Sequence, residues 1–418
     1  MLCLLSLLSL FFIYLLTLPC LSDPNSSAKS LFFYFFVWLI SLFLVLKKRN
    51  LSIDSLVVSF FLFFFLFFIS ALFTEGDIGS AYVQVCGLLT GGVFLVVLRN
   101  QNVCHDNLVW RGMWLLTFIA IVYALFGLYQ YHDFLLHGQR STMLIPNFLP
   151  STRSRLAGLF GQPNFQATLM LVGLCCLGYL YKIESVFFKK LPTQLGFCLL
   201  TILLLINFFL ANSRAGMVAF FCLVLLLLWH ARSAFRKKLP TLFSRKEVFT
   251  LLLLIGISWL LYWLTISFLL PDGQRVDIVR SGSIYNRINM WVSSLLMAWD
   301  HPWLGIGPDN FKTYLAEYQI RSHGLVKFHY EDLIYTRWAH NEYLQILAEG
   351  GILTFLAMIA FMVFAVRGIT LKLRESNSPE QWLVPLALVP ILVHAGFEWP
   401  LRFAPFFVTF LLLVSLAV

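Results

Sequence analysis

Residues 51–73 have the sequence LSIDSLVVSFFLFFFLFFISALF, which decides the class of fold because it contains one charged residue, Asp54. About 20 mostly apolar residues in a row suffice for an α-helix to cross the hydrocarbon core of a bilayer. The whole chain has a similar character, since 60% of its 418 residues are hydrophobic and 12% are charged, against about 25% charged residues in average soluble domains. The composition excludes soluble globular, disordered and disulfide-scaffold proteins, and predicts an all-α, polytopic membrane protein.

We expect about twelve membrane-spanning helices. Apolar stretches lie at 1–21, 31–46, 51–73, 81–98, 113–131, 164–181, 191–211, 214–229, 248–270, 343–366, 382–397 and 401–418. The alternative for the first stretch is a signal peptide, but Met1-Leu2-Cys3 provides no positively charged start and no A-x-A cleavage site follows. We therefore expect the first stretch to be a retained span. The eight cysteines lie at neither disulfide nor metal spacing, and we expect buried, inert thiols.

The basic residues predict the orientation. Seventeen of the 30 Lys and Arg residues fall on one side, in compact loops at 47–49, 99–111, 182–190, 232–246 and 367–374. Short loops rich in Lys and Arg remain cytoplasmic, so both termini are expected there and the other loops outside. The chain then divides into N-terminal helices (1–131), helices with periplasmic elements (132–270), a periplasmic loop (271–342) and C-terminal helices (343–418).

The loop at 271–342 is too long for a simple connector. Its residues 286–300 have apolar side chains at helical spacing, at Ile288, Trp291, Leu295 and Trp299. Pro308-Asp309-Asn310 has the composition of a second helix start. We therefore expect two short amphipathic helices that lie over the membrane surface.

The thirteen basic residues expected outside differ in kind from those inside. Ten of the thirteen are arginine, whereas the inner loops have eight arginines and nine lysines. A guanidinium makes bidentate contacts with phosphate and an ammonium does not. The bias indicates a bound phosphate or diphosphate, and the net charge of +10 does not indicate a nucleic-acid partner. The alternative is pairing with acidic residues of the loop, namely Asp272, Asp277, Asp309, Glu331 and Asp332.

Three arginines are the strongest candidates for anion binding. Arg214 lies between two apolar runs with almost no loop around it, where a charge is costly unless it pairs or reaches the surface. Arg287 opens a helical segment, where a cation opposes the helix dipole unless an anion is bound. Arg155 precedes a Gly- and Pro-rich turn before the helix at 164–181, whose free N–H groups also favour an anion. The alternatives are a surface charge for the first two and a purely structural turn for the third.

His340 is the candidate base, because it lies at the start of a span, on the face that packs inward. A neutral histidine can accept a proton near pH 7. Asn341 is expected to be the N-cap of that span, and Glu398 lies in a short turn where pairing with Arg402 is the alternative to a role in the site. Nucleotide, zinc-protease and serine-nucleophile motifs are absent from the sequence. We therefore expect no metal and no cofactor.

Five short segments together resemble the O-antigen ligase superfamily of bacterial membrane glycosyltransferases. They are Arg155-Leu-Ala-Gly-Leu-Phe-Gly-Gln-Pro-Asn164, Asn212-Ser-Arg-Ala-Gly216, Asn286-Arg-Ile-Asn-Met-Trp291, Pro302-Trp-Leu-Gly-Ile-Gly307, and Ala339-His-Asn-Glu-Tyr-Leu-Gln345 with Glu349-Gly-Gly351. Each is short, but all five occur in the expected order and on the expected outer side. The superfamily includes lipopolysaccharide O-antigen ligases, O-antigen polymerases and protein O-oligosaccharyltransferases.

The resemblance implies a glycan carried on undecaprenyl diphosphate and transferred en bloc, without metal and with inversion, at the periplasmic face of the bacterial inner membrane. It implies that Arg214 and Arg287, with Arg155, hold the diphosphate, and that His340 orients or deprotonates the acceptor hydroxyl. The supporting residues are Gln162, Asn164, Asn341 and Glu398. The acceptor is lipid A-core or a protein such as pilin, and a polymerase acting on growing glycan is the third variant. A transporter or flippase for the same lipid-linked glycan is the alternative from another class, and discontinuous spans would indicate it.

Overall fold

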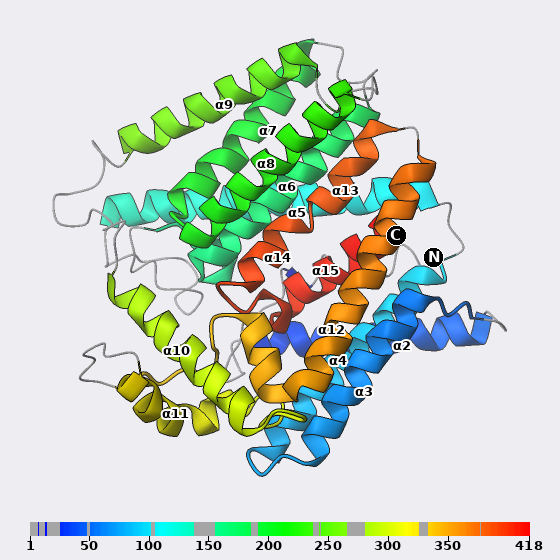
Figure 1. The fold of residues 1–418 in the computed structure, drawn as a ribbon. Coiled ribbons are helices and arrows are strands. Elements are labelled where there is room, and N and C mark those ends of the chain that lie inside the picture. The colour runs from blue at the N-terminus through cyan, green and yellow to red at the C-terminus, as the bar shows by residue number, and fades with distance from the viewer. Residues whose placement is uncertain are drawn as a thin grey trace.

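The computed structural model describes residues 26–47, 51–101, 105–137, 155–184, 191–236, 244–265, 281–325, 333–376 and 378–418, together with Leu7, Ile13, Tyr14 and Leu242. Within these residues the regular structure is entirely helical (Figure 1), which confirms the predicted class. The expected span at 1–21 lies outside the described residues apart from three positions. Most of the residues in the loops at 132–154 and 266–280 also lie outside the described residues.

Long helices form a bundle in the order of the chain. They are α2 (Ser26–Lys47), α3 (Ser55–Leu72), α4 (Ile78–Arg99), α5 (His105–His137), α6 (Pro163–Ile183), α7 (Leu191–Leu210), α8 (Arg214–Arg236), α9 (Arg245–Leu264) and α12 (Glu342–Glu375). Eight of the described helices, α3 to α9 and α12, are long and apolar enough to cross a membrane. The shorter apolar helices are Phe32–Leu42, within α2, and α15 (Ala404–Ala417).

Residues 382–397 do not form the continuous span expected for them. They form α13 (Leu383–Leu386) and α14 (Val389–Ala395), preceded by a 3-10 turn at Pro379–Trp382 and followed by another at Pro400–Arg402. Pro385 and Pro390 lack the N–H groups that a continuous helix would need, so the chain breaks where hydropathy alone suggested one span. The expected number of twelve spans is therefore not reached in the described part of the chain.

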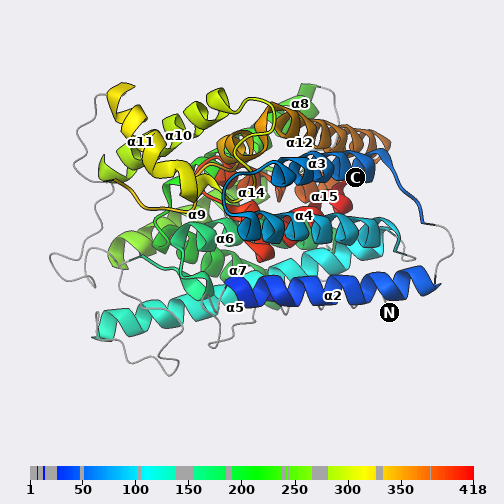
Figure 2. The same cartoon turned by 90° about the horizontal axis from the view of Figure 1, so that it is seen from below.

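The centre of the bundle is formed by α6 and α15, while α2 and α9 lie at its edges (Figures 1 and 2). Almost every residue of α15 is buried. A Cβ at Gly173 of α6 would collide with the Cβ of Ala120 on α5, so the missing side chain permits the close approach of these two helices. Cys175 and Cys176 are buried there as expected, whereas Cys86 is exposed on the surface of α4.

Two further helices, α10 (Ser281–Asp300) and α11 (Phe311–Leu325), lie together at one corner of the molecule and pack against the start of α12 (Figure 1). They confirm the two helices expected in this loop. The apolar side chains Leu295 and Trp299 of α10 do not pack against the protein, because Leu295 is 50% and Trp299 82% exposed. The buried face instead carries Met290 and Met297 with small polar residues such as Ser293, which let α11 and α12 approach closely.

A kink at Gly351 divides α12. Gly351 has φ 67° and ψ −175°, a backbone conformation restricted almost entirely to glycine. The turn at 302–307 contacts the helix at this kink, where Ile352 N–H donates to Pro302 O over 2.8 Å and Gly307 N–H donates to Glu349 O over 2.9 Å. The two sequence segments at 302–307 and 349–351 are therefore one structural unit, which fixes the α10–α11 layer to the bundle.

Candidate functional site

The side chain of Glu398 is the centre of the candidate site. It lies between α14 and the 3-10 turn at 400–402 and is 1% exposed. Its Oε1 accepts hydrogen bonds from Arg287 Nη2 at 2.6 Å and from Asn164 Nδ2 at 2.7 Å. Its Oε2 lies 2.6 Å from Nδ1 of His340. One carboxylate therefore joins side chains from α6, from α10 and from the residue before the cap of α12.

His340 is held in an unusual backbone conformation. Its φ is +52°, which is uncommon for a residue other than glycine and costs roughly 1–2 kcal/mol. The next residue, Asn341, is the N-cap of α12 as predicted, because its side chain accepts a hydrogen bond from Leu344 N–H at 3.1 Å. The abrupt start of α12 thus turns the imidazole toward Glu398. With Nδ1 in contact with the carboxylate, Nε2 is the nitrogen left to act on another molecule.

Asn164 connects Glu398 to a second group of predicted residues. Its Oδ1 accepts hydrogen bonds from Ser213 Oγ at 2.7 Å and Arg155 Nη2 at 3.2 Å. Arg155 Nε also donates to Ala211 O at 3.1 Å. The Gly- and Pro-rich segment before α6 and the Ser-Arg element before α8 are therefore in direct contact, although they are distant in the sequence.

Local backbone geometry explains why Asn164 points into this network. Gly158 and Gly161 have φ of +59° and +66°, which produces the tight turn expected from their glycines. Gln162 then occupies the N-cap position of α6, Pro163 follows at its start and Asn164 comes next. At the neighbouring helix, Ser213 Oγ accepts a hydrogen bond from Gly216 N–H at 3.0 Å and so caps α8.

The structure thus brings five of the predicted site residues into one hydrogen-bonded network: Arg155, Asn164, Arg287, His340 and Glu398. Arg214 is the first residue of α8 and is joined to the network through the backbone of Ser213. Asn341 caps α12 with its side chain, whereas Gln162 occupies the N-cap position of α6 without a capping hydrogen bond from its side chain. The predicted residues therefore converge on one place, where three helices begin.

Other arginines expected on the outer side pair with acidic residues. Arg337 makes two hydrogen bonds to Asp309, at 2.9 and 2.5 Å, and Arg321 pairs with Asp300. The alternative of pairing within the loop is therefore correct for Arg337, whereas Arg321 pairs with an acidic residue that was not among those expected. Asp272, Asp277, Glu331 and Asp332 lie outside the described residues, as do Arg140, Arg153, Arg275, Arg280 and Lys327.

Glu398 does not pair with Arg402, which was the structural alternative for this residue. Arg402 instead contacts Glu342 at 3.2 Å and Glu349 at 2.7 Å, and its side chain is 3% exposed. The 3-10 turn at 400–402 directs Arg402 to the start of α12, whereas Glu398 lies on the side of Asn164 and Arg287. The two residues are close in sequence but belong to separate charge clusters.

The electrostatics favour an ionised Glu398. Burial alone would raise the pKa of this carboxyl group, but the hydrogen bond from His340 and the positive charge of Arg287 outweigh burial and hold the pKa below its ordinary value. A charged carboxylate accepts a hydrogen bond from an imidazole N–H and fixes the orientation of the ring. The arrangement can therefore present Nε2 of His340 as a proton acceptor.

Two contributors were missed in the sequence. His394, one helical turn before Glu398, is buried and lies 2.9 Å from Thr168 Oγ1, which in turn donates to Asn164 O. The spacing of four residues between His394 and Glu398 was the available signal. Trp338 also stacks on Trp399, with ring centroids 5.2 Å apart, beside His340 and Glu398 in the sequence. Nothing in the pattern indicated that the two tryptophans meet.

Comparison with known families identifies the central part of the chain. Residues 199–359 match the family model described as O-Antigen ligase. The matched region contains Arg214, Arg287 and His340, while Arg155, Asn164 and Glu398 lie outside it. A comparison with curated proteins found no match. The match confirms the resemblance found in the sequence for this part of the chain, and it supports membrane glycosyl transfer of the ligase or polymerase type.

Proposed function

We propose that this protein transfers a glycan en bloc from undecaprenyl diphosphate to an acceptor hydroxyl on the periplasmic face of the bacterial inner membrane. The contact between His340 and Glu398, next to Arg287, carries the proposal. It combines a proton acceptor, a carboxylate that orients it and a cation for a diphosphate in one place. The membership of residues 199–359 in the superfamily supports the same reaction class.

The reaction would proceed in one displacement. Nε2 of His340 accepts the proton of the acceptor hydroxyl, and the hydroxyl oxygen bonds to the anomeric carbon of the first sugar. The bond between that carbon and the diphosphate oxygen breaks, so the configuration inverts and undecaprenyl diphosphate leaves. Glu398 stabilises the imidazolium that forms, which is the role of a carboxylate behind a histidine base. No metal takes part in the proposed step.

The diphosphate would be held by Arg287 and Arg214, with Arg155. Among the described residues, Arg287 uses only Nη2 for a hydrogen bond, to Glu398, which leaves Nε and Nη1 for phosphate oxygens. Arg214 lies at the N-terminus of α8, where the helix dipole also favours an anion. Cations fixed before the reaction stabilise the charge that develops on a departing diphosphate without reorganisation.

The acceptor is proposed to be lipid A-core or a protein such as pilin, and growing glycan in the polymerase variant. Deletion of the gene separates these cases, because loss of a ligase removes long-chain lipopolysaccharide from a core that remains intact. Loss of a protein ligase leaves the lipopolysaccharide ladder unchanged and lowers the mass of pilin, because pilin no longer carries the glycan. Loss of a polymerase leaves single glycan units attached to the core.

A transporter of the same lipid-linked glycan is the second candidate. The break between α13 and α14 and the kink of α12 at Gly351 are the discontinuities that favour it, since transporters bind substrates at broken helices. A transporter would move lipid-linked glycan across vesicles and form no new glycosidic bond. The contact between the His340 imidazole and the Glu398 carboxylate favours chemistry over transport.

The decisive experiment uses purified protein, lipid-linked glycan and a candidate acceptor, with the product measured by mass. We expect His340→Ala and Arg214→Ala to lower transfer by at least 100-fold, as loss of an acid–base or charge-stabilising group does. His301→Ala, which changes an exposed histidine of the α10–α11 layer, is the matched control. Undiminished transfer in both site variants would remove the proposed site, and translocation without transfer would support the transporter.

A further inference from the structure

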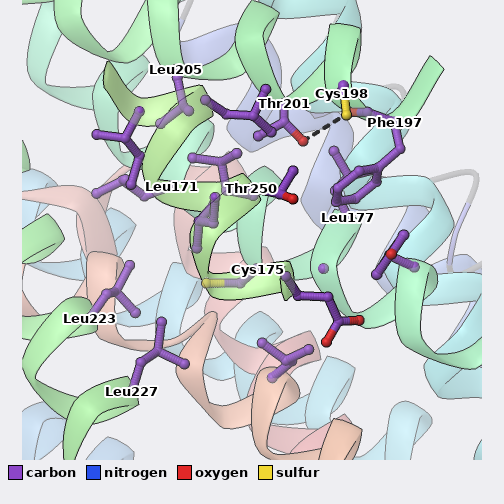
Figure 3. Close-up of a pocket in the computed structure, with 18 of the residues that line it drawn as sticks. Leu171, Cys175, Leu177, Phe197, Cys198, Thr201, Leu205, Leu223, Leu227 and Thr250 are labelled. Carbon is purple, nitrogen blue, oxygen red and sulfur yellow. Dashed lines mark hydrogen bonds between the residues drawn. The ribbon is translucent and has the colours of Figure 1, made fainter. Parts of the chain in front are cut away.

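A cavity of about 440 Å³ lies among α6, α7, α8, α9 and α13, separate from the Glu398 site (Figure 3). Its deep part is lined by buried apolar side chains, including Leu171, Leu205 and Leu223, with Thr201. Thr201 donates its hydroxyl to Phe197 O over 2.9 Å, so it exposes no free polar donor to the cavity. The interior is therefore hydrocarbon-like.

This cavity is large enough to hold a ligand. Ligand-binding pockets in proteins measure about 300–1,000 Å³, while an apolar void of only about 150 Å³ already binds small hydrophobic molecules. Water is a poor occupant, because a buried water needs two to four polar partners. The space exists because α9 packs mainly on α7. Only 17% of the membrane-spanning part of α9 is buried. The space between α9 and the bundle thus suits a hydrocarbon chain.

The cavity opens at the end of the bundle remote from Glu398. Its lining on α6 begins at Leu171, seven residues and about 10 Å along the helix from Asn164. The exposed lining residues are Gln194 near the start of α7 and Lys246 and Thr250 near the start of α9. The mouth is therefore polar and the depth apolar, as the two ends of a lipid molecule require.

Charge at the mouth identifies the headgroup. Lys182 is neutralised by Glu247 at 2.6 Å, whereas Lys246 is exposed and forms no ion pair with a described residue. The adjoining segment at 232–246 contains six basic residues and no acidic one. Basic clusters at a membrane surface attract anionic lipids. We propose that the cavity binds one acyl chain of an anionic phospholipid, whose headgroup lies against Lys246.

Native mass spectrometry of the delipidated full-length protein tests this proposal, with equal amounts of phosphatidylglycerol and phosphatidylcholine added in detergent. We expect a one-to-one phosphatidylglycerol adduct to dominate. Thr201→Phe, which fills the depth of the cavity, should reduce that adduct by at least tenfold. Leu199→Phe is its matched control, because Leu199 is on the same helix but 66% exposed and outside the lining. The adduct should survive in the control.

A variant at the surface tests the proposal even if Thr201→Phe fails to fold. Lys246→Gln should lower the preference for phosphatidylglycerol over phosphatidylcholine about fivefold, the effect of one basic residue near an anionic lipid. Arg111 is an exposed basic residue of α5 at the same end of the bundle as Lys246, and Arg111→Gln should leave the lipid preference unchanged. Equal binding of the two lipids to the native protein, or an adduct that Thr201→Phe and Lys246→Gln both leave intact, would overturn the proposal. A co-purified prenyl diphosphate in place of the phospholipid would also overturn it.

Discussion

Nδ1 of His340 lies 2.6 Å from Oε2 of Glu398, across 58 residues of sequence, and the other carboxylate oxygen of Glu398 accepts hydrogen bonds from Arg287 and Asn164. The backbone of His340 has a positive φ at this position. Such strain persists where the surrounding structure over-determines it, and it concentrates at functional sites. The contact with Glu398 and the cap formed by Asn341 hold the backbone of His340 in this conformation. We therefore propose that the pair, and not His340 alone, is the functional unit.

Glu398→Gln should lower the rate of glycan transfer by roughly 100- to 10,000-fold. Glutamine keeps the size of the side chain, but it cannot stabilise a protonated imidazole by charge. The rate constant of a single turnover in the transfer assay measures this effect. Glu317→Gln, on an exposed residue of α11, should retain full activity. A Glu398→Gln enzyme as fast as the native one would show that the carboxylate only holds the fold.

The stability of the protein should depend on acid pH through Glu398. Its pKa in the folded state is below the ordinary value of about 4.3. The group therefore stabilises the fold fully above that ordinary value, and this contribution disappears as pH falls from there through the lowered pKa. The midpoint of thermal unfolding of the native protein should drop more steeply in this range than that of Glu398→Gln. Parallel curves for the two proteins down to pH 3 would contradict the prediction.

Arg287→Ala should lower kcat/KM for the lipid-linked donor by at least about 30-fold. Removal of one partner of a buried charge pair typically costs about 2 kcal/mol or more, and Arg287 and Glu398 are 18% and 2% exposed in their side chains. Arg287→Lys should recover only part of the loss, because lysine lacks the bidentate geometry of the guanidinium. Arg321→Ala removes an exposed pair with Asp300 and should change kcat/KM less than twofold. Equal losses in the two alanine variants would argue against a specific role of Arg287.

Local sequence signals predicted the pieces of this site but not their connections. The N-cap at Asn341 and the tight turn before Asn164 are local features, since a cap or a glycine turn depends on neighbouring residues. The partner of Glu398 is different. Arg402 lies four residues away and was the natural candidate by proximity, but the partners in the structure are Arg287 and His340. Long-range charge pairing follows the tertiary fold, which one sequence does not reveal.

The error in the fold at 382–397 has a similar origin. Hydropathy at 382–397 suggested one span because it averages over Pro385 and Pro390, whereas backbone hydrogen bonding depends on each proline. The helix expected at 286–300 is present as α10, and the side that packs against the protein is smaller and more polar than the side that carries Leu295 and Trp299. A helix that packs closely against two neighbours selects small residues at the contact. An apolar stripe therefore did not identify the packed side.

Arg402→Met should destabilise the fold by about 3–5 kcal/mol, because it leaves the buried carboxylates of Glu342 and Glu349 without their cation. The midpoint of thermal unfolding measures this loss. The triple variant Arg402→Met, Glu342→Gln, Glu349→Gln removes all three charges and should restore most of the stability. A triple variant as unstable as the single one would mean that packing around Arg402, and not charge, is responsible.

Gly351→Ala should weaken the attachment of the α10–α11 layer and reduce transfer at the distant His340. Alanine is strained by about 1–3 kcal/mol at φ 67° and ψ −175°, and its Cβ would collide with the carbonyl of Trp303. Relief of the collision moves the 302–307 turn away from the kink, and with it α10, which carries Arg287. The expected result is a lower unfolding midpoint together with a lower kcat. Gly324→Ala, at a helical glycine with open space around it, should instead be neutral or stabilise by up to about 1 kcal/mol. If Gly351→Ala lowers stability but leaves kcat unchanged, the kink holds the layer without positioning Arg287.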